Sequence, residues 1–392
     1  MTTDKKPKNK FLRIIVPIIL LAATGAFIYV ENTLITFGET AFFQETDIRF
    51  SHSFDDRASI YASGNRFFYL STRDGIRFVS SENGEIRWNH SYSMLDPILK
   101  GRGDYAAVCD NRGNILFVFG PSGLLHTEKR FDNPILFFTV NARGDSGVIL
   151  QEGEDYRVFA FDRAGSTIFE YVIAENNIMP LAMDISEDGR IVAISLLDIN
   201  NIAVNSRIIF IYTREEGRSY SRSIFSGFEH ENQLVPFIRF MANNRLIYMS
   251  DVEIGLIDVE AQGGSRISWR MPLRNKVDAI AFMGNRGFAI AYGEGLRGMD
   301  PLPEGRMEIY NLDLHRTGEH DFSRRVTYLN ATADFVVAAE GRYFKAFNQR
   351  GGILWEFAAL SYVRDIMFVE RNVNNIVMQT NTDTTVLRRV RN

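Results

Sequence analysis

The chain has 392 residues, of which 45% are apolar, and a formal net charge of −4 at pH 7. This apolar share is that of a folded protein and excludes a disordered chain. Five basic residues but one acidic residue lie among the first 13 positions, so the rest of the chain is more acidic still. It therefore lacks the basic excess that holds nucleic acid. The single cysteine, Cys109, excludes an intrachain disulfide and is expected to be a small buried apolar residue.

The N-terminal 30 residues have the pattern of a membrane anchor. Four lysines lie within residues 1–10, and Phe11–Val30 is a stretch of twenty residues whose one charge is Arg13. Twenty helical residues span about 30 Å, the thickness of the hydrocarbon core. The basic flank predicts an N-terminus in the cytoplasm. We therefore expect residues 1–10 to be a cytoplasmic basic tail and 11–30 to be a single transmembrane helix in a bacterial cytoplasmic membrane.

A cleaved signal peptide is the alternative interpretation of the same segment. Signal peptides have an apolar run of about 7–15 residues with a small-residue cleavage site behind it. Here the run is longer, and the small residues Ala22, Ala23, Gly25 and Ala26 lie inside it. This pattern favours an uncleaved anchor, followed by a stalk at 31–46 and an extracytoplasmic domain at 47–392.

A short phrase recurs along the exported part: a glycine turn, then an aromatic residue four or five positions later. Its clearest copies end in the three tryptophans, Trp88, Trp269 and Trp355. Weaker copies run from Gly165 to Phe169 and from Gly318 to Phe322. Runs of five to eight residues between turn signals predict four strands per unit. Short strands repeating about every 40–50 residues are typical of a β-propeller, and the tryptophans are then outer-strand packing residues in equivalent places.

Eight units are predicted, so the fold class is all-β, an eight-bladed β-propeller, with seven blades as the alternative if two weak units merge. The first unit begins near Arg57, and the others begin near Pro97, Pro134, Leu181, Phe237, Val277, Val326 and Tyr362. The last unit has three strands when the chain ends. An extra strand, Asp47–Phe54, precedes the first unit. Because an open ring would leave two unpaired edges, we expect this strand to complete the eighth blade by pairing with the C-terminal strand.

The glycine-and-aromatic phrase resembles the repeat of quinoprotein-type (PQQ-like) propellers. That family includes quinone-dependent dehydrogenases and non-enzymatic eight-bladed envelope scaffolds. The combination with one N-terminal anchor also looks like uncharacterised bacterial envelope proteins. In the dehydrogenases the resemblance implies axial cofactor and calcium ligands, commonly with a disulfide between adjacent cysteines. One cysteine cannot supply that disulfide, so the resemblance implies the scaffold branch and no cofactor.

No motif in the sequence predicts catalysis or metal binding. The six histidines lack the spacing of a zinc site, and no cysteine pair supports them. The Gly293–Gly298 stretch fits a dinucleotide-binding pattern, but both of its flanks are predicted strands. We therefore expect no catalytic, cofactor-binding or metal-binding residues. Carboxylates that meet only in the folded chain stay open as an alternative, as the basis of a hydrolase or lyase.

Three long connections indicate a binding surface. Asp198–Ser206, Ser226–Pro236 and Gly293–Gly305 all connect strands at the same end of a propeller, where insertions often mark the binding face. Side chains that could contact a partner there are Phe228, His230, Glu231, Leu296, Met299 and Leu302. The predicted function is a non-enzymatic, membrane-anchored protein-binding scaffold. The alternative is a sensor of a glycan or small ligand in the axial channel, and an acidic channel would favour the hydrolase or lyase.

Overall fold

A computed structural model describes residues 41–42, 48–53, 58–62, 66–121, 123–200, 203–213, 224–260, 264–332, 334–369 and 371–388. The chain divides into two units, residues 1–42 and 43–392, and the first is described only at strand β1 (Ala41–Phe42). The predicted basic tail, the transmembrane helix at 11–30 and most of the stalk lie outside the described residues. Within the described part, no helix is long and apolar enough to cross a bilayer.

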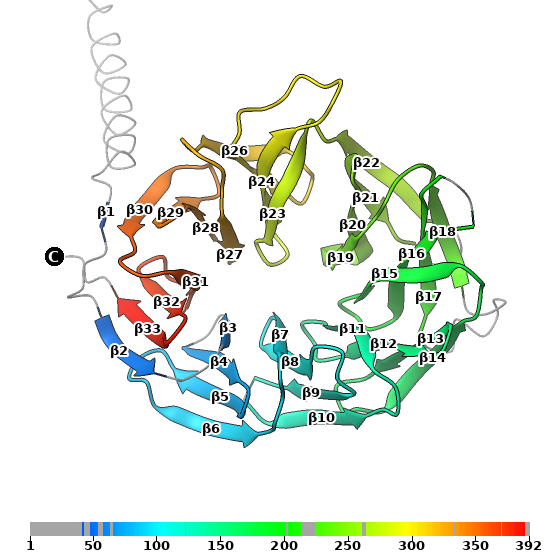
Figure 1. The fold of residues 1–392 in the computed structure, drawn as a ribbon, viewed down its shortest axis with the longest axis horizontal. Helices are drawn as coiled ribbons and strands as arrows, with labels where there is room; N and C mark the ends of the chain where they lie inside the picture. The colour runs from blue at the N-terminus through cyan, green and yellow to red at the C-terminus, as the bar shows by residue number, and fades with distance from the viewer. Residues whose placement is uncertain are drawn as a thin grey trace, which may run out of the picture. The chain divides into compact units, whose positions relative to one another are not determined.

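The second unit is a ring of eight antiparallel sheets of four strands each (Figure 1). The first four blades consist of β3 (Ser59–Ala62), β4 (Phe67–Thr72), β5 (Gly75–Ser80) and β6 (Ile86–Ser91); β7 (Pro97–Arg102), β8 (Tyr105–Asp110), β9 (Ile115–Phe119) and β10 (Leu125–Arg130); β11 (Ile135–Val140), β12 (Ser146–Glu152), β13 (Asp155–Phe161) and β14 (Thr167–Ile173); β15 (Ile178–Ile185), β16 (Ile191–Asp198), β17 (Asn205–Tyr212) and β18 (Ile224–His230).

The other four blades follow the same order. They consist of β19 (Phe237–Met241), β20 (Arg245–Met249), β21 (Glu253–Asp258) and β22 (Arg266–Pro272), with a 3-10 turn at Ala242–Asn244; β23 (Asn275–Phe282), β24 (Gly287–Gly295), β25 (Arg306–Asn311) and β26 (Arg316–Asp321); β27 (Tyr328–Ala331), β28 (Phe335–Glu340), β29 (Tyr343–Asn348) and β30 (Ile353–Ala358); β31 (Val363–Phe368), β32 (Asn375–Thr380), β33 (Asp383–Arg388) and β2 (Ile48–Ser53). The predicted count of eight blades is confirmed.

The first strand of each blade lines the central opening, and the fourth lies at the outer rim (Figure 1). The middle strands are covered on both sides by neighbouring blades. This explains why Tyr105–Cys109 and Ile191–Ile194 are continuous apolar runs, both buried along their whole length. Fourth strands such as β22 alternate between partly buried and exposed residues, because one of their two faces meets solvent. The sequence therefore encodes strand position within the blade.

The ring closes through two segments from opposite ends of the chain. Strand β2 is antiparallel to β33, with Ile48 opposite Leu387 and Ser53 opposite Asp383. The Ser53 hydroxyl donates a hydrogen bond of 2.7 Å to the Asp383 carboxylate. This is the pairing expected for Asp47–Phe54. It gives the last blade its fourth strand and covers the edge that β33 would otherwise leave unpaired.

Each tryptophan of the repeat lies on a fourth strand and contacts the following blade. Trp88 of β6 stacks on Phe119 of the second blade at 5.3 Å between ring centroids. Trp269 of β22 packs into the apolar core shared by the fifth and sixth blades. Trp355 of β30 is fully buried, and its indole nitrogen donates a 2.8 Å hydrogen bond to the Val373 carbonyl of the eighth blade. The three residues thus fasten neighbouring blades together.

The glycine of the phrase holds a left-handed backbone conformation in two of its three clearest copies, with φ = 75° at Gly84 and 78° at Gly351. The predicted copy at Gly318 is displaced. Gly318 lies inside β26, and Leu314 takes the left-handed position in that turn, with φ = 60°. Leu314 tolerates it because its side chain is buried in the core between the fifth and sixth blades. Packing here overrides the usual preference for glycine.

Candidate functional site

The connections at one end of the ring form a continuous surface, which we call the long-loop face. It consists of the links between blades and the connections from second to third strands, because antiparallel order brings both to the same end. Hydrogen bonds join the two kinds of connection, from Met94 to Arg73, from Leu296 to Arg274 and from Ala359 to Arg342. The other two kinds of turn form the opposite face.

Exposed large apolar side chains concentrate on the long-loop face. Of the fourteen among the described residues, eleven lie in its connections or in the first two residues of the strand ends that enter them: Leu95, Ile98, Val172, Met179, Ile199, Val204, Val252, Met299, Tyr343, Leu360 and Tyr362. Three belong to the opposite face: Ile86, Leu124 and Leu125. Scattered single apolar residues are normal on any surface, but their concentration on one face indicates a contact surface.

One of the two most exposed of these residues, Leu95, is held on an ordered link. Leu95 is 79% exposed between the first and second blades. The Asp110 carboxylate accepts hydrogen bonds from the backbone nitrogens of Leu95 at 3.0 Å and Asp96 at 2.7 Å. Beside this link lies a hollow of about 520 Å³ that includes Tyr92 and Phe117, whose rings stack at 5.8 Å. No signal in the sequence predicted this hollow, because the connections around it are short.

The six residues predicted to contact a partner differ in their exposure to solvent. Glu231 and Met299 are exposed. Phe228 and His230 lie on strand β18, so the predicted loop Ser226–Pro236 is in fact a link of six residues, 231–236. His230 is buried with its ring 4.6 Å from that of Tyr248. Glu229 lies on the solvent face of this outer strand, whereas His230 lies on the face that packs inward.

The long connection of the sixth blade is anchored from inside. Leu302 is buried, and its backbone nitrogen and carbonyl both bond to the side chain of Asn275, at 2.7 and 3.1 Å. Leu296 packs partly buried against the same core. Met299, between them, is 47% exposed. This connection therefore presents Met299 while its other two apolar residues hold it in place; the partner contact predicted for all six residues stays a prediction.

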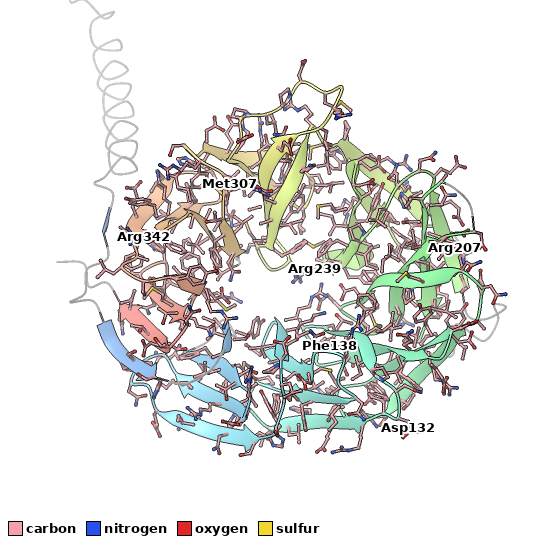
Figure 2. All side chains as sticks on the ribbon, viewed as in Figure 1. Asp132, Phe138, Arg207, Arg239, Met307 and Arg342 are labelled. Atoms are coloured by element: carbon pink, nitrogen blue, oxygen red, sulfur yellow. The ribbon has the colours of Figure 1, made fainter. Side chains whose placement is uncertain are left out.

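The axis of the ring contains two cavities. The larger, about 700 Å³, is lined by residues of all eight blades at the opposite face. The smaller, about 420 Å³, is lined by the inner strands β7, β11, β15 and β19. Gly101, Arg102 and Arg239 line both cavities. The side chains of Arg102 and Arg239 therefore lie at the waist between them, and Figure 2 shows Arg239 at the inner rim of the ring.

Arg102 is the centre of a buried ion-pair network. Its guanidinium donates to the Asp184 carboxylate at 2.9 Å, lies 2.8 Å from the Glu187 carboxylate, and also bonds to the carbonyl of Phe240. Asp184 accepts further bonds from the Thr139 hydroxyl at 2.9 Å and the Phe240 nitrogen at 2.7 Å. The network ties together four consecutive blades.

These contacts leave Asp184 saturated, because each of its oxygens already accepts two hydrogen bonds. Acid–base chemistry at a carboxylate needs a lone pair or proton that can reach a substrate. The channel is also neither sealed and apolar nor predominantly acidic, since Arg102, Arg239, Arg286 and Arg371 line its larger cavity beside Asp104 and Glu187. The geometry thus gives no support to a hydrolase or lyase centred on Asp184. No three or more His, Cys, Asp or Glu in the described part of the chain are grouped to hold a metal ion.

The neighbouring Arg239 differs from Arg102 in its contacts. Its guanidinium carbon lies 4.3 Å from the centroid of the Phe282 ring. Its Nε is buried without a hydrogen-bond partner, and no described carboxylate lies within 4.0 Å of its guanidinium nitrogens. Burial, followed by the charge of Arg102, lowers the pKa of Arg239 to about 10, so it remains a cation at neutral pH. Sequence reasoning missed both arginines, because inner-strand residues from different blades meet only in the ring.

Comparison with known proteins identifies a family and a fold. The sequence model of a "Family of unknown function (DUF5711)" matches residues 42–388. No curated protein matches the sequence. Among solved structures, Sqt1 from Chaetomium thermophilum is similar at 10% identity and a TM-score of 0.55, over 88% of this chain and 99% of that one. BamB from Moraxella catarrhalis aligns at 13% identity and a TM-score of 0.49, over 87% of this chain and 99% of that one. At such identity the likeness to Sqt1 shows the propeller fold alone, and the quinoprotein-type repeat stays a prediction.

Proposed function

We propose that this chain, which belongs to the DUF5711 family of unknown function, is a non-catalytic module that binds a partner protein through its long-loop face. The observation that carries the proposal is the concentration of exposed apolar side chains on that face. Aromatic and aliphatic residues that project from an ordered surface are the usual anchors of a protein interface. A rigid ring presents them with little ordering cost, because its connections are already held by backbone hydrogen bonds.

We further propose that Phe11–Val30 anchors the propeller at the outer side of a bacterial cytoplasmic membrane. The twenty-residue apolar stretch and its basic flank support this arrangement. A tether of this kind would keep the propeller near membrane-bound partners and raise its effective concentration there.

Topology can be tested with single introduced cysteines, because the native Cys109 is buried and should react poorly. In intact cells a membrane-impermeant maleimide should label Leu124→Cys on the propeller and should not label Thr3→Cys. Labelling of Thr3→Cys after the membrane is permeabilised is the positive control. Protection of Leu124→Cys until permeabilisation would contradict the proposed location.

The binding face can be tested by photo-crosslinking in the native membrane. A photoreactive residue at Leu95 or at Leu360, both on the long-loop face, should give an adduct with the same partner. Leu124 is the matched control, since it is a leucine 65% exposed on the opposite face. Equal adducts from Leu124, or none from either long-loop position, would contradict the proposal. The aspartate variants of Leu95 and Leu360 should weaken capture of that partner by about tenfold or more.

A further inference from the structure

At the waist of the axial channel, cationic side chains outnumber carboxylates. Three cations meet there, Lys100 and Arg102 from β7 and Arg239 from β19, with two carboxylates, Asp184 of β15 and Glu187 of the turn after it. Arg102 contacts both carboxylates directly. The ammonium of Lys100 donates to the Phe138 carbonyl at 2.9 Å and lies over the Phe138 ring. Of these three cations, Arg239 alone has neither an ion pair nor a hydrogen bond to a described residue.

Other groups around Arg239 do not supply the missing partner. Phe282 of β23 covers one flat face of the guanidinium. The hydroxyl of Tyr61 on β3 donates to the Gly103 carbonyl at 2.8 Å. Arg286, across the larger cavity, is ion-paired with Asp334. A planar cation held against a ring keeps its N–H donors in the plane of the guanidinium, which is the arrangement that binds a carboxylate or phosphate through two bonds.

The space around Arg239 is large enough for more than a bare ion. The cavities that it separates have volumes of about 700 and 420 Å³. Small-molecule sites in proteins are clefts of about 300–1,000 Å³ with a few polar groups that fix orientation. An unpartnered buried donor lowers the stability of the ligand-free protein, and an anion that pairs with it would relieve that cost.

We propose that the axial channel is a binding site for a small oxyanion, a carboxylate or a phosphate group, and that Arg239 is the residue that pairs with it. The body of such a ligand lies in the larger cavity at the opposite face. Arg102 is not a ligand residue but a positioning residue, because Asp184 and Glu187 already occupy its donors. This site is independent of the long-loop face, so either proposal can fail without the other.

Thermal unfolding and calorimetric titration of the full-length chain in detergent test the site, with inorganic phosphate and citrate as separate probes at constant ionic strength. At least one probe should raise the melting temperature and give a saturable heat. Arg239→Met should reduce its affinity at least about tenfold. Arg342→Met is the matched control, because Arg342 is exposed at the outer rim (Figure 2) and should leave affinity unchanged. A response to phosphate alone or to citrate alone identifies the anion class.

The proposal would be wrong if neither probe stabilised the wild-type chain, or if Arg239→Met and Arg342→Met reduced affinity equally. Arg239→Lys provides a second reading that does not depend on the methionine variant folding. It keeps the charge but loses the two-bond geometry, so its affinity should lie between those of the wild type and Arg239→Met. Wild-type affinity in Arg239→Lys would also contradict the assigned role.

Discussion

The two ends of the propeller differ in chemistry and in how they are built. The long-loop face carries exposed apolar residues on connections of uneven length. The opposite face includes tight turns such as that of Asn141, a fully buried residue whose side-chain oxygen accepts bonds from the nitrogens of Arg143 and Asp145, both at 2.9 Å. It also holds the arginine-lined cavity of the channel. One end is therefore suited to contact a surface, and the other to enclose a small charged group.

The two ends should also differ in how well they tolerate substitution. At the opposite face, turn side chains hydrogen-bond to the backbone and pair with charges of neighbouring blades. A substitution there therefore affects the stability of the ring. On the long-loop face, a few inward residues hold each connection while the tips meet solvent. The following variants test this difference, beginning with the largest expected effect.

The largest effect is expected at the waist of the channel. Arg102→Met would leave Asp184 and Glu187 without their ion-pair partner in a buried site. Removing one member of a buried ion pair lowers the free energy of unfolding by about 3–5 kcal/mol. Urea denaturation of the full-length chain in detergent measures this. Arg342→Met at the outer rim should change it by less than about 0.5 kcal/mol, and equal losses in the two variants would contradict the structural role of the network.

A smaller effect on the free energy of unfolding is expected within one connection of the long-loop face, where Leu302 and Met299 should differ. Leu302→Ala removes a buried anchor and should lower the free energy of unfolding by about 2–3 kcal/mol, the low end for buried leucines, because the site lies near the surface. Met299→Ala should change it by less than about 0.5 kcal/mol, since Met299 is an exposed tip. The same denaturation experiment measures both. If Met299→Ala cost as much as Leu302→Ala, the tip would be part of the fold and not a free contact residue.

The smallest expected effect is on the pH dependence of stability. It arises from His230, on the outer strand β18 that enters the long-loop face. Burial lowers the pKa of His230 below its usual 6.5. The folded chain therefore binds this proton less tightly than the unfolded chain, and stability should fall as pH decreases below 6.5. His230→Phe should remove that part of the acid sensitivity in melting curves recorded at successive pH values. His315→Phe, at an exposed histidine, should leave it unchanged; loss of the acid sensitivity there instead would show that His230 is not its source.

Much of the ring could be predicted from the sequence because each blade repeats local signals. Turn residues, short strands and a recurring outer aromatic gave eight units, and the predicted starts fall within three residues of β7, β11, β15, β19, β23, β27 and β31. The closing strand was predictable because an incomplete last unit and a spare first strand leave one economical pairing. Loop exposure was less predictable: Phe228 and Leu302 are apolar residues that pack inward, and no local pattern distinguishes them from Met299.

The sequence by itself thus determined the blade, the number of blades and the positions of Trp88, Trp269 and Trp355, because these follow from contacts between residues close in the chain or one repeat apart. Only the tertiary structure decided which charges meet on the axis. Arg102, Asp184 and Arg239 come from three different blades, and their pairing depends on the curvature of the closed ring. The same curvature places the apolar tips of separate connections on one face, which no single repeat reveals.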